Sequence, residues 1–435
     1  MRFTLALLVG KALAALGKLT KRGTNAPGAV ALKICPDPLA HFQFRGTILG
    51  VTGSNGKTST SNMVAHILRE NGKTVAHNAK GSNLLGGVAT TLLTSSTLSG
   101  RIEEDFVVLE VDERYSRLIF RHFAPDYLLV TNLFRDQLTR NGNVDVIVEK
   151  LHEAIAPSVK LILNASDPIS ARLAPNNPRV YYDVDRTSQS TPESVNITHD
   201  AKACPACLHK LEYEYFHYNH IGRFHCPHCG YQSPVATYFF DQVDVDSGNF
   251  YLGEYPIHTD YKSVFNLFNI AGAVSACCEL GIAPADAARA ISQFKLMKER
   301  YDEMEIEGRK AVMILSKNQN PVSFDQSISH VLSMPGEKTV LVYVGDINHT
   351  NNKDTTWLYD VSFERLRDGV SSVVCVGPRA YDLAVRLSLA GFDPQQVQVE
   401  RDMAQVKQAV DKTQGTLCLM TELYDAKAVL EVLKG

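Results

Sequence analysis

Gly50-Val-Thr-Gly-Ser-Asn-Gly-Lys-Thr-Ser-Thr-Ser61 is the stretch that decides the fold, because it places a glycine-rich turn between a strand and a helix. Thr47–Val51 is apolar and β-branched, and from Lys57 to Glu70 the apolar residues recur on one helical face. Glycines let the backbone approach phosphates, while backbone N–H groups and the helix N-terminus attract anions. The stretch therefore predicts a phosphate-binding loop in which Lys57 meets the terminal phosphates and Thr58 offers a hydroxyl to Mg²⁺.

The length and composition indicate a globular protein of several domains. At 435 residues the chain is too long for one typical core, so two or three domains are expected. It has 45% hydrophobic and 21% charged residues, and its net charge of -3 gives no reason to expect a nucleic-acid partner. Residues 1–20 predict an amphipathic helix that packs against the rest of the protein. A signal peptide and a transmembrane span are not expected, because Lys11 interrupts the apolar run before it reaches the length that either needs.

Strands and helices alternate twice along the chain. The first series of buried strands is Thr47–Val51, Phe106–Val111, Tyr127–Thr131 and Lys160–Asn164, and the second is Ala311–Leu315, Val340–Val344, Val373–Val376 and Thr416–Met420. Helices are expected at Val264–Leu280 and Pro284–Phe294. Such alternation is typical of α/β domains with a mostly parallel sheet. We therefore expect an N-terminal helical segment at 1–45, a central domain at 46–297 and a Rossmann-like C-terminal domain at 298–435.

Four of the nine cysteines form two C-x-x-C pairs. Cys204 and Cys207 are followed, after 18 intervening residues, by Cys226 and Cys229. This spacing is typical of a tetrahedral zinc ribbon, whereas a redox C-x-x-C motif would stand alone on a thioredoxin-like unit. Four thiolates leave no open coordination position, so we expect a structural zinc in an insertion at about 200–232. A histidine of the insertion, His225 or His228, is the substitute ligand to consider.

Phosphoryl transfer also needs Mg²⁺ ligands near the loop. Glu110 ends an expected strand at the carboxyl edge of the sheet, and Asp112 and Glu113 follow it as residues that could belong to a solvated turn. The form T-G-S-N-G-K-T resembles the ATP loop of the Mur ligase superfamily, whose members join amino acids to peptidoglycan precursors or glutamates to folate with ATP. Four further stretches resemble motifs of that superfamily in the same order: Thr131-Asn-Leu-Phe-Arg-Asp-Gln-Leu-Thr-Arg-Asn-Gly142, Asn164-Ala-Ser-Asp-Pro168, Phe265-Asn-Leu-Phe-Asn269 and Lys298-Glu-Arg-Tyr-Asp-Glu-Met304.

The resemblance implies a Mur-ligase-like central ATPase domain that binds ATP and Mg²⁺. The residues that it assigns to this role are Gly53, Asn55, Gly56, Lys57, Thr58, Ser59, Asn132, Asp136, Asn164, Asp167, Asn266, Asn269 and Arg300, with Glu110 as a catalytic residue. Gln137 stands where the superfamily has a metal-binding histidine, and Thr139 stands where it has a second aspartate.

A zinc insertion and a glutamine at position 137 are both typical of one branch, the MurT proteins, which work with the glutaminase GatD. Lys353-Asp-Thr-Thr-Trp-Leu-Tyr-Asp360 is similar to the motif in which this branch offers an aspartate to the catalytic histidine of GatD. The resemblance assigns that role to Asp354, which would complete a Cys-His-Asp triad in the partner. Taken without the resemblance, an aspartate before two threonines is more often a helix cap.

The resemblance implies an ATP-dependent amidating ligase subunit. It would activate the D-glutamate α-carboxylate of lipid II as an acyl phosphate, and ammonia from a GatD-like glutaminase would form D-isoglutamine in a heterodimer. The site would be cytoplasmic, at the inner face of the membrane, without a transmembrane segment. The alternatives are a stand-alone Mur or folylpolyglutamate-type ligase, a zinc-ribbon ATPase on nucleic acid, and a catalytically weakened scaffold. The departures near Gln137, Thr139, Gln319 and Lys353 keep the last alternative open.

Overall fold

The computed structural model of the chain describes residues 1–19, 25–79, 81–136, 143–295, 301–317, 319–345, 354–422 and 425–434. They form two compact units. The first comprises Met1–Phe134, Val144–Glu193 and Ala201–Lys295, and the second comprises Arg135–Asn143, Ser194–Asp200 and Leu296–Gly435, each as far as it is described. Short pieces from the middle of the sequence therefore belong to the same unit as the final third of the chain.

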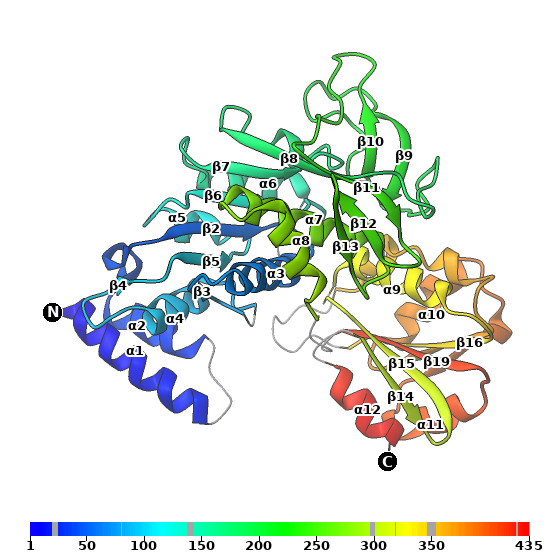
Figure 1. Cartoon of the computed structure of the whole chain (residues 1–435). Helices are drawn as coiled ribbons and strands as arrows, with labels where there is room; N and C mark the ends of the chain where they lie inside the picture. The colour runs from blue at the N-terminus through cyan, green and yellow to red at the C-terminus, as the bar shows by residue number, and fades with distance from the viewer. Residues whose placement is uncertain are drawn as a thin grey trace. The chain divides into compact units, whose positions relative to one another are not determined.

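The first unit is built on a nine-stranded sheet of described residues, with the order β13-β12-β11-β8-β7-β6-β2-β5-β3 (Figure 1). Its strands are β2 (Thr47–Thr52), β3 (Val75–His77), β5 (Phe106–Glu110), β6 (Tyr127–Val130), β7 (Lys160–Asn164), β8 (Arg179–Val184), β11 (Tyr238–Asp244), β12 (Asn249–Leu252) and β13 (Tyr255–His258). Neighbours are parallel from β3 to β11, and β12 and β13 add an antiparallel edge. The four strands expected here, and the mostly parallel sheet, are confirmed.

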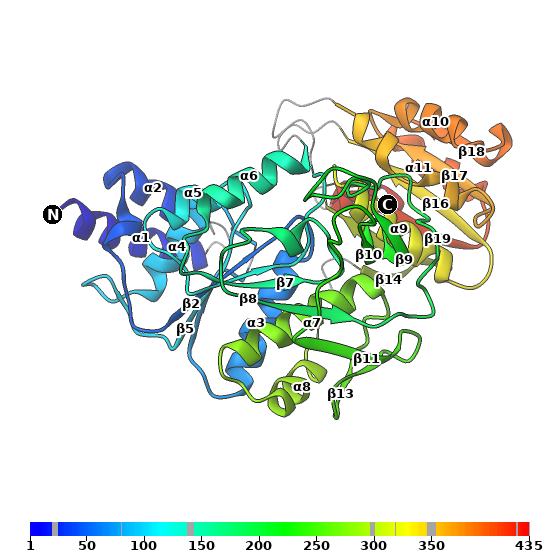
Figure 2. The same ribbon diagram turned by 90° about the horizontal axis from the view of Figure 1, so that it is seen from above.

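Helices cover both faces of this sheet, as Figure 2 shows from above. One face carries α3 (Lys57–Glu70), α7 (Val264–Glu279) and α8 (Pro284–Ser292), and the other carries α4 (Leu85–Ser95), α5 (Ser116–Phe120) and α6 (Val144–Ala154). The N-terminal helices α1 (Arg2–Leu19) and α2 (Ala26–Ile34) pack against α4. The expected helix over residues 1–20 is confirmed, and no helix in the described part of the chain is both long and apolar enough to span a membrane. Other short elements of this unit are η1 (Pro38–His41), η3 (Ser170–Arg172) and the strands β1 (Gln43–Phe44) and β4 (Arg101–Ile102).

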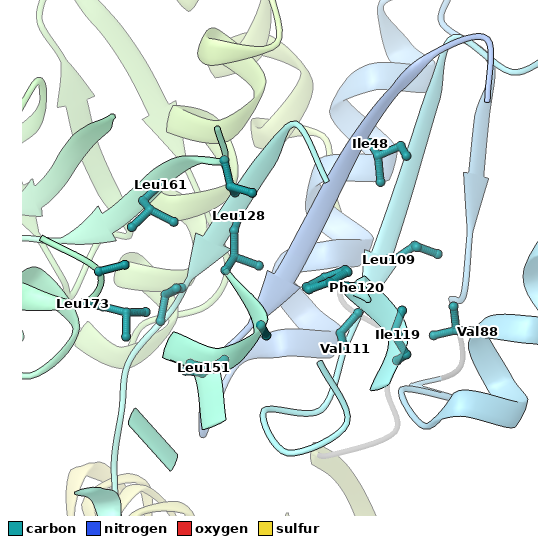
Figure 3. Packing of buried hydrophobic residues seen from close by; sticks show 14 of the residues in the cluster. Ile48, Val88, Leu109, Val111, Ile119, Phe120, Leu128, Leu151, Leu161 and Leu173 are labelled. Carbon is teal, nitrogen blue, oxygen red and sulfur yellow. The ribbon is translucent and has the colours of Figure 1, made fainter. Parts of the chain in front are cut away.

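The core under α4, α5 and α6 holds the sheet and these helices together. Leu109 of β5 and Leu128 of β6 point from the sheet toward Ile119 of α5 and Leu151 of α6 (Figure 3). All four side chains are buried to 1% exposure or less. Burial of each contributes about 1.5–3 kcal/mol to stability, so this layer fixes the strand ends from which the loops of the site emerge.

The second unit has a six-stranded sheet of described residues, with the order β14-β15-β19-β16-β17-β18. Its strands are β14 (Tyr301–Ile306), β15 (Arg309–Ser316), β16 (Lys338–Tyr343), β17 (Ser372–Val376), β18 (Val397–Glu400) and β19 (Thr416–Glu422). Only the pair β14–β15 is antiparallel. Along β16, Val340 and Val342 belong to one core and Leu341 to another, so both faces of this sheet are buried. The helices are α9 (Pro321–Ser333), α10 (Ala380–Leu389), α11 (Val406–Asp411), α12 (Ala426–Lys434), η4 (Thr356–Asp360), η5 (Phe363–Leu366), η6 (Pro394–Gln396) and η7 (Met403–Gln405).

Hydrogen bonds explain why Ser194–Asp200 belongs to the second unit. Asn196 Nδ2 donates to the buried Asp325 at 2.7 Å, and Thr198 Oγ1 donates to the carbonyl of Asp360 at 2.6 Å. Arg135 forms ion pairs with both Asp200 and Asp360. Asp325 is completely enclosed, and burial raises the pKa of its carboxyl to about 6. The segment thus supplies a donor that this buried carboxyl needs.

Candidate nucleotide site

The glycine-rich loop leaves β2 and enters α3 as the sequence predicts, with two glycines in conformations that other residues rarely adopt. Gly53 has a φ of +128° and Gly56 a φ of +84°. A Cβ on Gly53 would lie 2.2 Å from Thr131 Oγ1, and a Cβ on Gly56 would lie 2.0 Å from Asn269 Oδ1. Both positions therefore require glycine, and the loop backbone packs tightly against neighbouring side chains.

The segment after β6 braces this loop. Asn132 Oδ1 accepts from the backbone N–H of Asn55 at 3.0 Å, and Asn132 Nδ2 donates back to the Asn55 carbonyl at 3.2 Å. Ser54 Oγ donates to the Phe134 carbonyl at 2.9 Å and accepts from the Phe134 N–H at 2.8 Å. The structure therefore places the Asn132 amide on the loop backbone, where it fixes the shape of the loop.

Asn164 and Asp167 form a second supporting layer and are fully buried. Asp167 Oδ2 accepts from the backbone N–H of Leu133 at 2.8 Å, and Asp167 Oδ1 lies 3.4 Å from His220 Nε2. Asn164 Oδ1 accepts from the N–H of Ser166 at 2.9 Å. Asp167 thus contacts the bracing segment at Leu133, and Asn164 contacts its start, since Asn164 Nδ2 donates to the Thr131 carbonyl at 3.5 Å.

Lys57, the first residue of α3, lies in a buried cluster of carboxylates. Its Nζ donates to Glu113 Oε1 at 2.8 Å and also to the carbonyl of Gly53. Burial lowers the pKa of the Lys57 ammonium, but Glu113, Asp112 and Glu110 raise it by more, so its pKa lies above the ordinary value. Asp112 and Glu113 are only 7% and 3% exposed, so the reading of these two residues as a solvated turn is wrong. The turn after β5 folds back and aims Glu113 at the loop.

Glu110, the last residue of β5, presents a carboxylate oxygen suited to a cation. Its backbone is paired with the Asn78 side chain, and its Oε1 accepts from Asn83 Nδ2 at 2.9 Å. Its Oε2 is buried and has no hydrogen-bond partner among the described residues. A Cβ on Gly81 would lie 3.7 Å from this Oε2 and 3.2 Å from Thr58 Oγ1, so both oxygens lie beside Gly81. A carboxylate and a hydroxyl of this kind fit Mg²⁺, which takes few protein ligands and keeps several waters.

Two buried side-chain amides, one in the loop and one next to it, have N–H donors that bind no acceptor among the described residues. Asn55 Nδ2 and Asn269 Nδ2 are buried and have no acceptor among the residues that the structure describes. Asn266 and Ser59 lie half-buried on the first turns of α7 and α3. A phosphate or other nucleotide oxygen would satisfy the orphaned donors. Arg300 lies outside the described residues.

The four paired cysteines come together at one end of the hairpin formed by β9 (Glu212–Tyr218) and β10 (Ile221–His225). The Sγ atoms of Cys204 and Cys229 are 3.6 Å apart, those of Cys207 and Cys226 are 3.5 Å apart, and all four lie within 4.8 Å of one another. Sulfurs bonded at about 2.3 Å to a tetrahedral zinc lie about 3.8 Å apart, so the cluster could hold this metal. The predicted grouping of the four thiols is confirmed.

The two cysteine turns share one backbone pattern. The N–H of Cys204 donates to the His209 carbonyl, and the N–H of Cys226 donates to the Tyr231 carbonyl, both at 2.7 Å. Within each turn a residue with positive φ, Leu208 or Gly230, donates its N–H back to the first cysteine. Neither His225 nor His228 belongs to the four-thiol group, although His228 joins Cys207 and His209 in an adjacent cluster.

Asp136 and Asp354 both belong to the second unit. Asp136 Oδ1 accepts from Asn320 Nδ2 at 2.8 Å and its Oδ2 pairs with Lys317, so both carboxylate oxygens already have partners within that unit. Asp354 Oδ1 accepts from the backbone N–H of Thr356, the first residue of η4, at 2.8 Å. Gln137, Thr139 and Lys353 lie outside the described residues.

Comparison with known proteins shows which family of proteins has this architecture. A family model of the Mur ligase middle domain matches residues 51–226, and a model of the MurT ligase C-terminal domain matches residues 315–426. The structure is similar to a pseudomurein peptide ligase type C from Methanothermus fervidus, with a TM-score of 0.68 and 19% identity over 91% of this chain and 80% of that one. It is also similar to MurF from Acinetobacter baumannii, with a TM-score of 0.62 and 15% identity over 94% and 81% of the two chains. The fold and the glycine-rich loop are those of the Mur ligases.

Curated relatives show which family within the Mur ligases the chain belongs to. The chain is 32% identical to subunit MurT of the lipid II isoglutaminyl synthase (glutamine-hydrolyzing) of Staphylococcus aureus strain N315, over 92% of this chain and 89% of that protein. It is 26% identical to the subunit of the same name from Streptococcus pneumoniae, over 94% and 92% of the two chains. The chain therefore belongs to the MurT family of Mur ligases, which confirms the resemblance seen in its sequence.

Proposed function

We propose that this chain is the ATP-dependent subunit of an enzyme that amidates the α-carboxylate of D-glutamate in lipid II. The observation that carries the proposal is the buried Glu110 Oε2, which lies with Thr58 Oγ1 beside Gly81, together with a glycine-rich loop whose lysine is charged. The names of the two MurT relatives support the substrate and the amide donor. A lipid-linked acceptor would bring the protein to the inner face of the cell membrane.

In the proposed reaction, a carboxylate oxygen of the acceptor attacks the γ-phosphorus of ATP and ADP leaves, which gives an acyl phosphate. Ammonia then attacks the acyl carbon, and phosphate leaves as HPO₄²⁻ with the proton that the nitrogen loses. Lys57 holds the terminal phosphates as a cation, and the orphaned amide donors of Asn55 and Asn269 meet further nucleotide oxygens. Glu110 and Thr58 would hold Mg²⁺, which when bound neutralises charge on the transferring phosphoryl group.

We propose that a second protein supplies the ammonia. Of the cysteines outside the four-thiol cluster, Cys35, Cys277, Cys375 and Cys418 are buried. Burial raises the pKa of Cys375 to about 12, and it raises the pKa of both Cys278 and Cys418 to about 11, so their thiolates are scarce at neutral pH. We infer that a GatD-like subunit hydrolyses glutamine to glutamate and ammonia with its own nucleophile, and that Asp354 orients the histidine of that subunit.

Asp354→Asn tests this assignment in the complex with the glutaminase subunit. The amide cannot hold an imidazole in the productive tautomer, so amidation with glutamine should fall by several orders of magnitude. ATP binding and complex formation should persist, and ammonium at mildly alkaline pH should restore amidation. Asp368→Asn, at an exposed aspartate of the same unit, is the matched control. Full activity of Asp354→Asn with glutamine would remove Asp354 from the mechanism, and loss with both nitrogen donors would assign the loop a structural role.

We also propose that the four-cysteine cluster binds one structural Zn²⁺. The Sγ spacing and the matching backbone turns support this proposal, because such turns present two sulfurs in a fixed direction. Four protein ligands leave no position for a substrate, so the metal would stabilise the hairpin of β9 and β10 without taking part in the reaction.

A further inference from the structure

The loop between β15 and α9 touches the backbone of Asp354. Gln319 has a φ of +48°, and its backbone N–H donates to Glu422 Oε1 at 2.8 Å. Its side-chain Nε2 donates to the carbonyl of Asp354 at 3.4 Å. Through its backbone N–H and its side chain, Gln319 thus links Glu422, at the end of β19, to Asp354, which lies just before η4.

The loop itself is held at both ends by a buried carboxylate. Asp136 pairs with Lys317 before Gln319 and accepts from Asn320 after it. Asn320 is fully buried, and its Oδ1 also accepts from the N–H of Ser323 at 2.7 Å, which caps α9. Gln319 is only 8% exposed. A side chain enclosed in this way on a fixed backbone has little rotamer freedom, so its amide is aimed at one place.

We propose that Gln319 is a positioning residue for Asp354, acting through the main chain. Its amide holds the carbonyl of Asp354, while the N–H of Thr356 holds carboxylate oxygen Oδ1. The two contacts fix the residue at its backbone and at its side chain. This inference rests on the proposed role of Asp354 toward the partner's histidine. A misplacement of about 1 Å in such a constellation costs about 100-fold in rate, so a support of this kind has a measurable effect.

Gln319→Met tests the inference, because methionine has a similar length but no donor. In the complex with the glutaminase subunit, the kcat of glutamine-dependent amidation should fall by about tenfold, the equivalent of one lost hydrogen bond. Amidation with ammonium and the KM for ATP should stay at wild-type values. Gln395→Met, at an exposed glutamine of the same unit, should leave every rate unchanged.

Gln319→Asn is the second variant, and it keeps the test valid if Gln319→Met does not fold. Asparagine tolerates a positive φ well but is one methylene too short to reach Asp354, so the variant should fold and show the same loss. Wild-type glutamine-dependent rates in both folded variants would overturn the inference. Equal losses with glutamine and with ammonium would also overturn it, because they would indicate a general structural defect.

The same assay separates this inference from the proposed function. If Asp354→Asn loses glutamine-dependent activity while both Gln319 variants keep it, Asp354 retains its role and only the support by Gln319 is refuted. If Asp354→Asn keeps full activity, the proposed role of Asp354 fails, and an effect of Gln319 could not then be assigned to positioning that carboxylate.

Discussion

The buried ion pair between Lys57 and Glu113 predicts separate effects on stability and on ATP turnover. The two side chains are 7% and 4% exposed, and their charged atoms are 2.8 Å apart. At an effective dielectric constant of about 20 their attraction is about 6 kcal/mol, much of which offsets the cost of removing both charges from water. Removal of one partner leaves the other charge buried, so Lys57→Met and Glu113→Gln should each lower the free energy of unfolding by about 3–5 kcal/mol.

The double variant distinguishes a real pair from two independent effects. Because it leaves neither charge unpaired, its loss of stability in urea should be much smaller than the sum of the two single losses. Lys310→Met is the matched control, since Lys310 pairs with Glu303 at 3.4 Å with side chains 58% and 53% exposed, and it should cost less than about 1 kcal/mol. Strictly additive losses would refute the reasoning about the pair.

ATP turnover of the same variants tests the role of the lysine. Lys57→Met should abolish acceptor-dependent ATP turnover, because the terminal phosphates lose their counter-ion, and the double variant should not recover it. The raised pKa of Lys57 keeps it charged throughout the neutral range, so its contribution to stability is present below about pH 10 and is lost only at higher pH. Wild-type turnover in Lys57→Met would show that the loop does not bind the reacting phosphates.

Three further predictions concern the metals and the pH dependence. Glu110→Gln should raise the Mg²⁺ concentration needed for half-maximal turnover at least about tenfold, whereas exposed Glu103→Gln should not; an unchanged Mg²⁺ titration would exclude Glu110 as a ligand. Cys204→Ser should abolish the content of about one zinc per chain measured by elemental analysis and lower the melting temperature; unchanged zinc content would contradict the cysteine site. Burial lowers the pKa of His217 to about 4, so protonation favours the unfolded chain, and the free energy of unfolding should fall by roughly 3 kcal/mol from pH 7 to 4. His217→Phe should flatten this pH profile, whereas His258→Phe, at an exposed histidine, should not. A profile unchanged by His217→Phe would refute the assignment.

Local patterns in the sequence were enough to predict the loop and the four-cysteine cluster. The strand before Gly53 and the helix after Gly56 follow from apolar periodicity and glycine placement within a few residues. The grouping of the four thiols follows from their spacing, because each C-x-x-C turn presents two sulfurs on its own. In the loop, and within each C-x-x-C turn, the residues that define the feature are near neighbours in the chain.

The residues that the sequence did not reveal depend on contacts between distant segments. Glu113 is 56 positions from Lys57, and only the turn after β5 brings them together. The motif around Asp136 suggests a ligand of ATP or Mg²⁺, yet its carboxylate is taken up by Lys317 and Asn320, which are more than 180 positions away. No spacing rule records a pairing of that kind, because it depends on the tertiary path of the chain.

The interrupted path of the chain also limits how this protein can be divided. Asp325 and Asp360 accept hydrogen bonds from Asn196 and Thr198, which precede them in the sequence by 129 and 162 residues. A fragment cut shortly before β14 would therefore leave the buried carboxyl of Asp325 without one of its donors. A chimera that takes its C-terminal third from a relative would also need the Ser194–Asp200 segment of that relative. The two parts of the gene are therefore expected to change together.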